Sequence, residues 1–158
     1  MDKFDRSLLS LLQEDLRRST AELAEEIGLS PSATAKRTAR LWTENYIKRQ
    51  VVKLNRKRFR RPVTALVTVK LTTPKATVSE QFAKHVTAFQ EVTQCHAVTG
   101  DFDYLLMVCE RSIEEYHAFA QSTFGTLPIV QSYKTTFVLG TAKNEDILPD
   151  FALVERTE

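Results

Sequence analysis

The sequence predicts an α+β protein with two modules, a winged helix-turn-helix followed by a βαββαβ domain of the ferredoxin-like kind. Apolar residues at helical spacing occupy the first fifty residues, whereas alternating β-branched runs begin only after Pro62. Charge divides the chain in the same way. Residues 1–62 hold 15 Lys/Arg and 8 Asp/Glu, a balance of +7, whereas residues 63–158 hold 7 and 12, a balance of −5. We therefore expect a helix-turn-helix over 1–50, a basic linker strand over 51–62 and the ferredoxin-like domain over 63–158.

Three helices are expected in the first module. A helix over residues 3–15 follows from apolar residues that share one face: Phe4, Leu8, Leu11, Leu12 and Leu16. Ser19 and Glu22 have the spacing of a capping box, and Gly28 suits the C-terminal end of the short helix that this box opens. A third helix is expected over residues 31–43.

The third helix has the composition of a helix that reads DNA. Ser30 suits its N-cap and Pro31 its first turn. With Thr34, Thr38 and Leu41 facing inward, small and basic side chains face outward, where they can approach base edges and phosphates in the major groove. The alternative is a three-helix bundle with a solvated charged face. The predicted DNA-binding residues are Ser30, Ser32, Ala35, Lys36, Arg37 and Arg40.

A basic segment follows the third helix. Asn45 suits a left-handed cap, and residues 47–54 alternate in polarity as a strand does. Residues 55–61 hold five basic side chains in seven. This pattern predicts a wing or linker strand along the DNA backbone, and the alternative is a solvated linker between the modules. In either case DNA binding should depend strongly on salt, because neutralised phosphates release counterions.

The second module alternates strands and helices. Strands are expected over residues 63–71, 92–99, 103–109 and 130–139, where β-branched and alternating residues gather. Two apolar sets at helical spacing separate them: Val78, Phe82, Val86 and Phe89, then Ile113, Tyr116, Phe119, Ala120 and Phe124. The order βαββαβ predicts a four-stranded antiparallel sheet with both helices on one face.

The sheet face without helices should still carry apolar residues. Leu66 shares that face with Thr64, Thr68 and Lys70 of the first strand, and Val138 follows Lys134 and Thr136 on the last. An exposed apolar face of this kind usually binds a partner. We therefore expect a homodimer that packs sheet to sheet, which also suits DNA with palindromic half-sites.

The turn between the second and third predicted strands offers groups for both ends of an amino acid. Gly100 can adopt a positive φ and leave its backbone open to close approach. Backbone amides there can hold an anionic group, and Asp101 or Asp103 a cationic one. The turn therefore predicts a small-molecule effector site. The alternative is an ordinary turn, where Asp and Gly are common, on a DNA-architecture protein that needs no ligand.

Several function classes are not indicated by this sequence. No apolar run approaches the roughly 20 residues of a membrane span, and the N-terminus lacks the apolar region of a signal peptide. Cys95 and Cys109 have no metal-ligand spacing and are expected as small buried groups in a reducing cytoplasm, with a redox switch as the alternative. We therefore expect a cytoplasmic protein with no membrane partner, metal, cofactor or catalytic residue.

Motifs in both modules resemble the Lrp/AsnC family, the leucine-responsive and asparagine-responsive regulators, over about residues 2–149. The segment Val98–Leu106 is the most specific match, and the helix-turn-helix is moderately so. The remaining matching residues are Asp5-Arg6, Leu12–Asp15, Arg17, Ser19, Glu22–Ala24, Gly28–Ser32, Arg37, Arg40-Leu41, Ile47, Tyr116, Thr136 and Lys143.

The resemblance implies a transcriptional regulator whose C-terminal domain, of the RAM/ACT-like kind, binds an amino acid and forms dimers that can assemble into octamers. Carried over by position, the effector-binding residues are Thr99, Gly100, Asp101, Asp103 and Tyr104, with Thr136 from the last strand.

The chain departs from the family pattern at four positions. Asn45 stands where glycine is usual, Trp42 where a charged residue is common, and Thr34 and Thr38 where the recognition helix usually has apolar residues. Haem-pathway decarboxylases of similar architecture are an enzymatic alternative. It is disfavoured because the three histidines (His85, His96 and His117) are scattered over different predicted elements.

Overall fold

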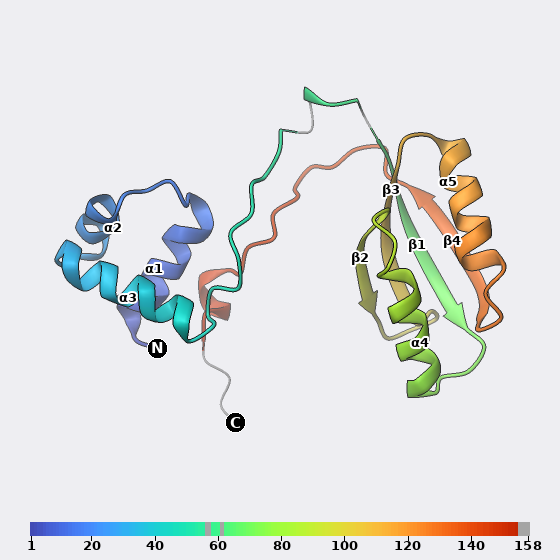
Figure 1. Ribbon diagram of the computed structural model, residues 1–158, viewed down its shortest axis with the longest axis horizontal. Helices are drawn as coiled ribbons and strands as arrows, with labels where there is room; N and C mark the ends of the chain where they lie inside the picture. Colours follow the sequence, from blue (N-terminus) through green and yellow to red (C-terminus); the bar gives the residue numbers. More distant parts are fainter. Residues whose placement is uncertain (56–57, 61, 155–158) are drawn as a thin grey trace. The chain divides into compact units, whose positions relative to one another are not determined.

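The computed structural model describes residues 1–55, 58–60 and 62–154, and the chain divides into two compact units (Figure 1). The N-terminal unit comprises Met1–Lys53 together with the C-terminal residues from Lys143. The sheet unit comprises Leu54–Ala142.

The N-terminal unit contains the three expected helices, α1 (Lys3–Glu14), α2 (Thr20–Ile27) and α3 (Pro31–Thr43). The capping box of Ser19 and Glu22 opens α2, and Ser30 caps α3, as predicted. The left-handed conformations are also as predicted. Gly28 has φ 71°, and Asn45, at φ 66°, is the one non-glycine residue with positive φ among the described residues. The helix-turn-helix is therefore confirmed.

A buried carboxylate that the sequence analysis did not identify joins α1 to α3. Asp5, 1% exposed, completes a capping box with Asp2 at the start of α1. Its two oxygens bind Arg37 Nη1 at 2.8 Å and Arg40 Nη2 at 2.6 Å. Arg37 also binds Asp2 at 2.7 Å. This ion cluster, formed by Asp2, Asp5, Arg37 and Arg40, locks α3 against α1.

The C-terminal segment packs on α1 rather than on the sheet. The Gln13 side chain exchanges two hydrogen bonds with the backbone of Leu148, at 2.8 and 3.2 Å. Ser10 hydrogen bonds to Asp150, which begins a 3-10 turn (η3, Asp150–Ala152), and Leu153 is 7% exposed. These contacts group the residues from Lys143 with the N-terminal unit, whereas the expected domain over 63–158 placed them with the sheet.

The predicted wing strand over residues 47–54 is not formed, and the residues from Ile47 to Asn55 have no regular secondary structure. A strand needs a neighbouring backbone to satisfy its amides and carbonyls, and Val51 and Val52 are 71% and 85% exposed instead. Lys53 Nζ donates to the carbonyl of Asn144 at 2.6 Å. Arg56, Lys57 and Arg61 lie outside the described residues.

The sheet unit has the predicted βαββαβ order (Figure 1). Its elements are β1 (Val63–Leu71), α4 (Ala76–Val86), β2 (Val92–Ala97), β3 (Tyr104–Glu110), α5 (Ile113–Ala120) with a π-helical extension, η2 (Gln121–Gly125), and β4 (Val130–Phe137). The strand order is β2-β3-β1-β4, with every pair antiparallel.

The two faces of the sheet differ as the alternation predicts. Val67 is fully buried with Phe82 of α4 and Phe124 of η2 in one core, so both helices cover the same face. On the open face, Leu66 pairs with Met107 and both are half-buried although no helix of this unit covers them.

We predict that Asp5→Asn destabilises the N-terminal unit by about 1.5–3 kcal/mol, because the neutral amide weakens the charge-assisted hydrogen bonds that Arg37 and Arg40 donate to the buried carboxylate. The amide retains an acceptor for the Asp2 backbone, so the substitution tests the charge. Urea unfolding followed by circular dichroism measures the effect. Asp15→Asn is the control, because Asp15 pairs with a 90% exposed Arg17 and solvent screening leaves such a pair with little effect on stability. Equal effects of the two substitutions would contradict this role.

The same cluster predicts a loss of stability in acid. Burial raises the pKa of Asp5, but hydrogen bonds from the Asp2 amide and Arg37 outweigh it, so that the pKa lies below its usual value. The amide of Asp5 and the Arg37 side chain lower the pKa of Asp2 to about 2. Depressed pKa values stabilise the fold above pH 4 or so, and this contribution disappears as the pH falls toward 2. Asp5→Asn should flatten the stability profile in that interval, and an unchanged slope would contradict it.

Candidate functional site

The outward face of α3 carries small side chains around one cation. Ser32, Ala35, Lys36 and Ala39 are exposed, as the sequence predicts. The turn before α3 is fixed by backbone bonds from Gly28 to Glu25 and from Leu29 to Ala24, at 3.3 and 3.0 Å. The result is a rigid helix that presents its backbone closely to a flat or grooved surface.

The two threonines of the inner face satisfy their hydroxyls within α3. Thr34 is fully buried and donates to the Ser30 carbonyl at 3.1 Å, while Thr38 donates to the Thr34 carbonyl at 3.0 Å. Such bonds to the preceding turn let a hydroxyl replace an apolar residue without leaving an unpaired polar group. The departure from the family pattern at these positions is therefore compatible with a packed helix.

The three predicted cations of α3 have different surroundings. Arg37 is held by Asp2 and Asp5 and lies 5.4 Å from the centre of the Phe4 ring. Arg40 binds Asp5 but keeps its side chain 46% exposed. Lys36 forms no ion pair with any residue that the structure describes. The cluster thus orients Arg37 and Arg40, and Lys36 is the cation that projects outward.

The predicted effector site contains a shallow pocket of about 170 Å³ beside the hairpin between β2 and β3. It lies entirely in the sheet unit. Polar and charged side chains from β1 and β4 face Asp101 and Phe102 across it. Its lining residues are Thr68, Lys70, Asp101, Phe102, Ser132, Tyr133 and Lys134.

Four of the predicted effector residues lie at or near this pocket, but only Asp101 lines it. Thr99 and Gly100 precede Asp101 in the exposed tip of the hairpin. Gly100 has φ 120° and open space around its α-carbon. Thr136 pairs with Leu66, which places it on the open face two residues beyond Lys134. The hairpin is confirmed, with a tip wider than expected because β2 ends at Ala97.

Asp103 and Tyr104 have structural contacts that the sequence analysis did not foresee. The Asp103 carboxylate accepts a hydrogen bond from the Leu71 amide at 2.7 Å, and its amide donates to the Val69 carbonyl at 2.9 Å. Tyr104 is 5% exposed in the helix-covered core, and its hydroxyl bonds Ser79. Tyr104 therefore lies on the opposite face of the sheet from the pocket. Asp103 ties the hairpin to β1.

Two lysines of the pocket were missed as site residues. Alternation had already assigned Lys70 and Lys134 to the open face, but strand order and register were needed to bring them together. The register pairs Lys70 with Ser132 and Thr68 with Lys134, so the two lysines are diagonal neighbours on adjacent strands.

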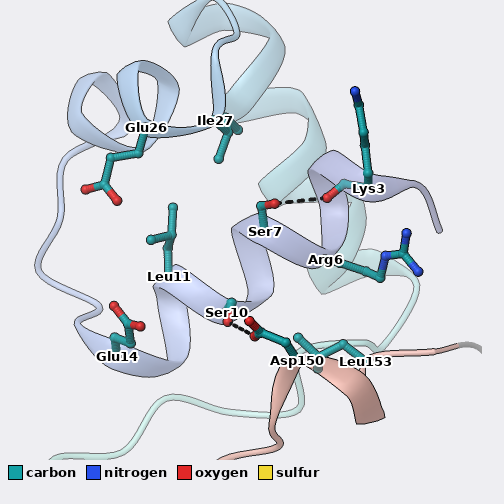
Figure 2. Close-up of a pocket in the computed structure, with 10 residues that line it drawn as sticks. All are labelled: Lys3, Arg6, Ser7, Ser10, Leu11, Glu14, Glu26, Ile27, Asp150 and Leu153. Atoms are coloured by element: carbon teal, nitrogen blue, oxygen red, sulfur yellow. Dashed lines mark hydrogen bonds between the residues drawn. The ribbon is translucent and has the colours of Figure 1, made fainter.

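A larger hollow of about 540 Å³ lies in the N-terminal unit (Figure 2). Side chains of α1 and α2 surround it together with Asp150 and Leu153 of the C-terminal segment. Its two acidic residues on the helices, Glu14 and Glu26, both bind Arg18, at 2.9 and 2.7 Å. No residue predicted for a site lines it. The hollow is the space left where the C-terminal segment crosses the helices.

Other chemically reactive side chains are dispersed. His85, His96 and His117 lie on α4, β2 and α5 respectively. Cys95 and Cys109 are half-buried rather than buried. Cys95 pairs with Leu106 and packs against the core from the edge strand β2, and its burial raises its pKa. Cys109 pairs with Thr64, which places it on the open face. In the described part of the chain, no helix is both long and apolar enough to cross a membrane.

Two family models match the chain. The model of the AsnC-type helix-turn-helix domain matches residues 1–41, and that of the Lrp/AsnC ligand binding domain matches residues 64–148. The first contains α1, α2 and most of α3. The second contains the whole sheet, the pocket beside Asp101 and part of the C-terminal segment.

Curated relatives and solved structures agree with these matches. The transcriptional regulator Zrp of Zymomonas mobilis is 40% identical over 116 residues, 73% of this chain and 76% of that protein. The leucine-responsive regulatory protein of Escherichia coli K12 is 32% identical over 148 residues, 94% and 90% of the two chains. These relatives are regulators, not enzymes.

Similar structures cover nearly the whole chain. An AsnC family transcriptional regulator from Agrobacterium tumefaciens superposes with a TM-score of 0.88 at 28% identity, over 98% of this chain and 100% of that one. A transcriptional regulator from Neisseria meningitidis in complex with L-Met superposes with a TM-score of 0.85 at 30% identity, over 94% and 96% of the two chains.

Proposed function

Because this chain belongs to the Lrp/AsnC family of DNA-binding transcriptional regulators with a ligand-binding domain, we propose that α3 contacts DNA and that the hairpin pocket binds an amino acid. The residues proposed to contact DNA are Ser30, Ser32, Ala35, Lys36 and Arg40, and the predicted Arg37 is proposed to position α3 instead. This function places the protein in the compartment that holds the chromosome, which in bacteria is the cytoplasm.

The exposed face of α3 is the observation that supports the DNA interface. Small residues at Ser32 and Ala35 allow its backbone to approach base edges, and Lys36 is free to reach a phosphate or a guanine. The ion cluster with Asp5 fixes the orientation of this face. Arg37 therefore acts by positioning α3, and Arg40 combines that role with a side chain that remains accessible to DNA.

We propose that the effector is held at the tip of the hairpin, with Asp101 receiving its ammonium group. Thr99, Gly100 and Thr136 border the site, while Asp103 and Tyr104 hold its walls in place. The pocket supports this assignment because it combines a carboxylate with ammonium groups from two other strands. A zwitterionic ligand requires both signs of charge within a few ångströms. The methionine complex of the Neisseria regulator supports an amino acid as the ligand class.

We also propose that the protein forms a homodimer through the open face of the sheet, and that dimers can assemble into octamers. Leu66, Leu105 and Met107 form a half-buried apolar strip on that face. Packing a second copy on it would remove this strip from water. Two copies of α3 would then be available for two half-sites. Light scattering of the purified chain measures the assembly, and a monomer at micromolar concentration would contradict it.

For the DNA interface, we predict that Lys36→Ala weakens binding to all sequences and reduces the slope of log K against log salt by about 1 per bound protomer, because one phosphate contact is lost. Fluorescence anisotropy at several salt concentrations measures both quantities. Lys84→Ala is the matched control, because Lys84 is an exposed lysine on α4 of the sheet unit. Unchanged affinity and slope for Lys36→Ala would move the DNA interface away from α3.

For the effector site, we predict that Asp101→Ala weakens binding of the cognate amino acid about tenfold or more, because a hydrogen bond to a charged group contributes about 1.5–3 kcal/mol. A thermal-shift screen of the twenty amino acids identifies the ligand, since saturation at 100 times the dissociation constant stabilises by about 2.7 kcal/mol. Glu80→Ala, an exposed carboxylate on α4, is the control.

Two results of that screen would contradict the effector assignment. If Asp101→Ala responds as the unaltered chain does, the ligand binds elsewhere. If no amino acid stabilises the unaltered chain, a DNA-architecture protein that needs no ligand becomes the better account.

A further inference from the structure

The charges of the hairpin pocket are unequal. Lys70 and Lys134 contribute two ammonium groups, whereas Asp101 is the single carboxylate that lines it. Lys70 has one ionic neighbour, Asp103, at 3.9 Å, and the other oxygen of that carboxylate is already bound to the Leu71 amide. Among the described residues, neither Lys134 nor Asp101 has an ion-pair partner. The side chains that line the pocket therefore carry one more positive charge than an ordinary zwitterion would neutralise, and Asp103, outside the lining, approaches Lys70 only to 3.9 Å.

The register places these charges at separate points of the pocket. Lys70 lies opposite Ser132, and Lys134 lies opposite Thr68 on the neighbouring strand. Diagonal neighbours of this kind are about 7–8 Å apart. The two ammonium groups can therefore engage two different carboxylates of one small molecule. The hydroxyls of Thr68 and Ser132 lie between them as further donors.

The uncharged part of the lining disfavours other amino acids. Phe102 is the aromatic side chain of the lining, because the Tyr133 ring packs against Phe124 on the other face of the sheet. No leucine, isoleucine, valine or methionine lines the pocket among the described residues. A branched aliphatic side chain would thus be placed against ammonium and hydroxyl groups. A second cation on the ligand would be repelled by both lysines. A dicarboxylate without an ammonium group would leave Asp101 facing like charge.

From this balance we infer that the effector is an acidic amino acid, aspartate or glutamate. The α-carboxylate and the side-chain carboxylate bind Lys70 and Lys134, and the ammonium group binds Asp101. This inference rests on the proposed effector site and specifies its ligand class. It makes the second lysine the group that selects an acidic ligand over its neutral amide.

Isothermal titration of the full chain with matched ligands tests this specificity. L-glutamate and L-aspartate should bind at least tenfold more tightly than L-glutamine and L-asparagine, which keep the shape and lose one charge. Succinate, which lacks the ammonium group, should bind more weakly than either acidic amino acid. L-leucine, which has a branched aliphatic side chain, should also bind more weakly than either acidic amino acid.

Substitution of Lys134 should remove the selectivity and keep the fold. In Lys134→Gln the ratio of glutamate to glutamine affinity should fall to near one, with the affinity for glutamine within about twofold of the original. Lys84→Gln on α4 should leave both affinities unchanged. Failure of Lys134→Gln to lower the ratio would overturn the inference.

The remaining outcomes separate this inference from the proposed function. Tighter binding of leucine, methionine or a neutral amide than of both acidic amino acids would overturn the acidic preference and leave an amino-acid effector in place. Succinate binding as tightly as glutamate would overturn the assignment of the ammonium group to Asp101. Absence of binding by every amino acid tested would overturn both the inference and the proposed effector function.

Discussion

The helix-turn-helix depends on one buried charge. Asp5 is almost completely removed from water, and that position is tolerable only because two guanidinium groups and a backbone amide neutralise it. This pairing fixes the relative position of α1 and α3, because a shift of either helix would expose the Asp5 carboxylate or separate it from its arginines. The small residues on the outside of α3 are useful for DNA recognition only when that helix is fixed. Charge inside the unit thus determines how the exposed face is presented.

Local signals predicted the helices and strands well, because their causes lie within a few residues. Ser19, Gly28 and Ser30 define helix ends through bonds to neighbouring backbone groups, and alternation on β1 separates Val67 from Leu66. The role of Asp5 depends on residues more than thirty positions away. Its spacing from Asp2 was a readable capping signal, but nothing local indicated that Arg37 and Arg40 would turn inward toward it.

The candidate pocket also combines features that local sequence predicts with features that only long-range contacts create. The glycine and acidic residues of the hairpin predicted a ligand at its tip. The lysines that line the pocket with Asp101 come from β1 and β4, and the sheet register was needed to bring them together. Tyr104 looked like a site residue because it adjoins the motif, yet its position in the strand directs it into the core. The prediction of a wing strand was wrong because it also depended on contacts that the local pattern does not reveal. Polarity alternates over residues 47–54, but a strand also needs a neighbouring backbone, and the described chain supplies none there.

The two units are joined by two stretches of chain, because the segment after β4 returns to α1 and is held there by Gln13 and Leu153. β4 itself carries Ser132 and Lys134 of the pocket. We propose that effector binding and DNA binding belong to one coupled equilibrium. Measuring DNA affinity by fluorescence anisotropy, with and without a saturating effector, tests this directly. Coupling of 1–3 kcal/mol predicts a change of about 5–150-fold, with DNA changing effector affinity by the same factor. Equal DNA affinity in both conditions would contradict it.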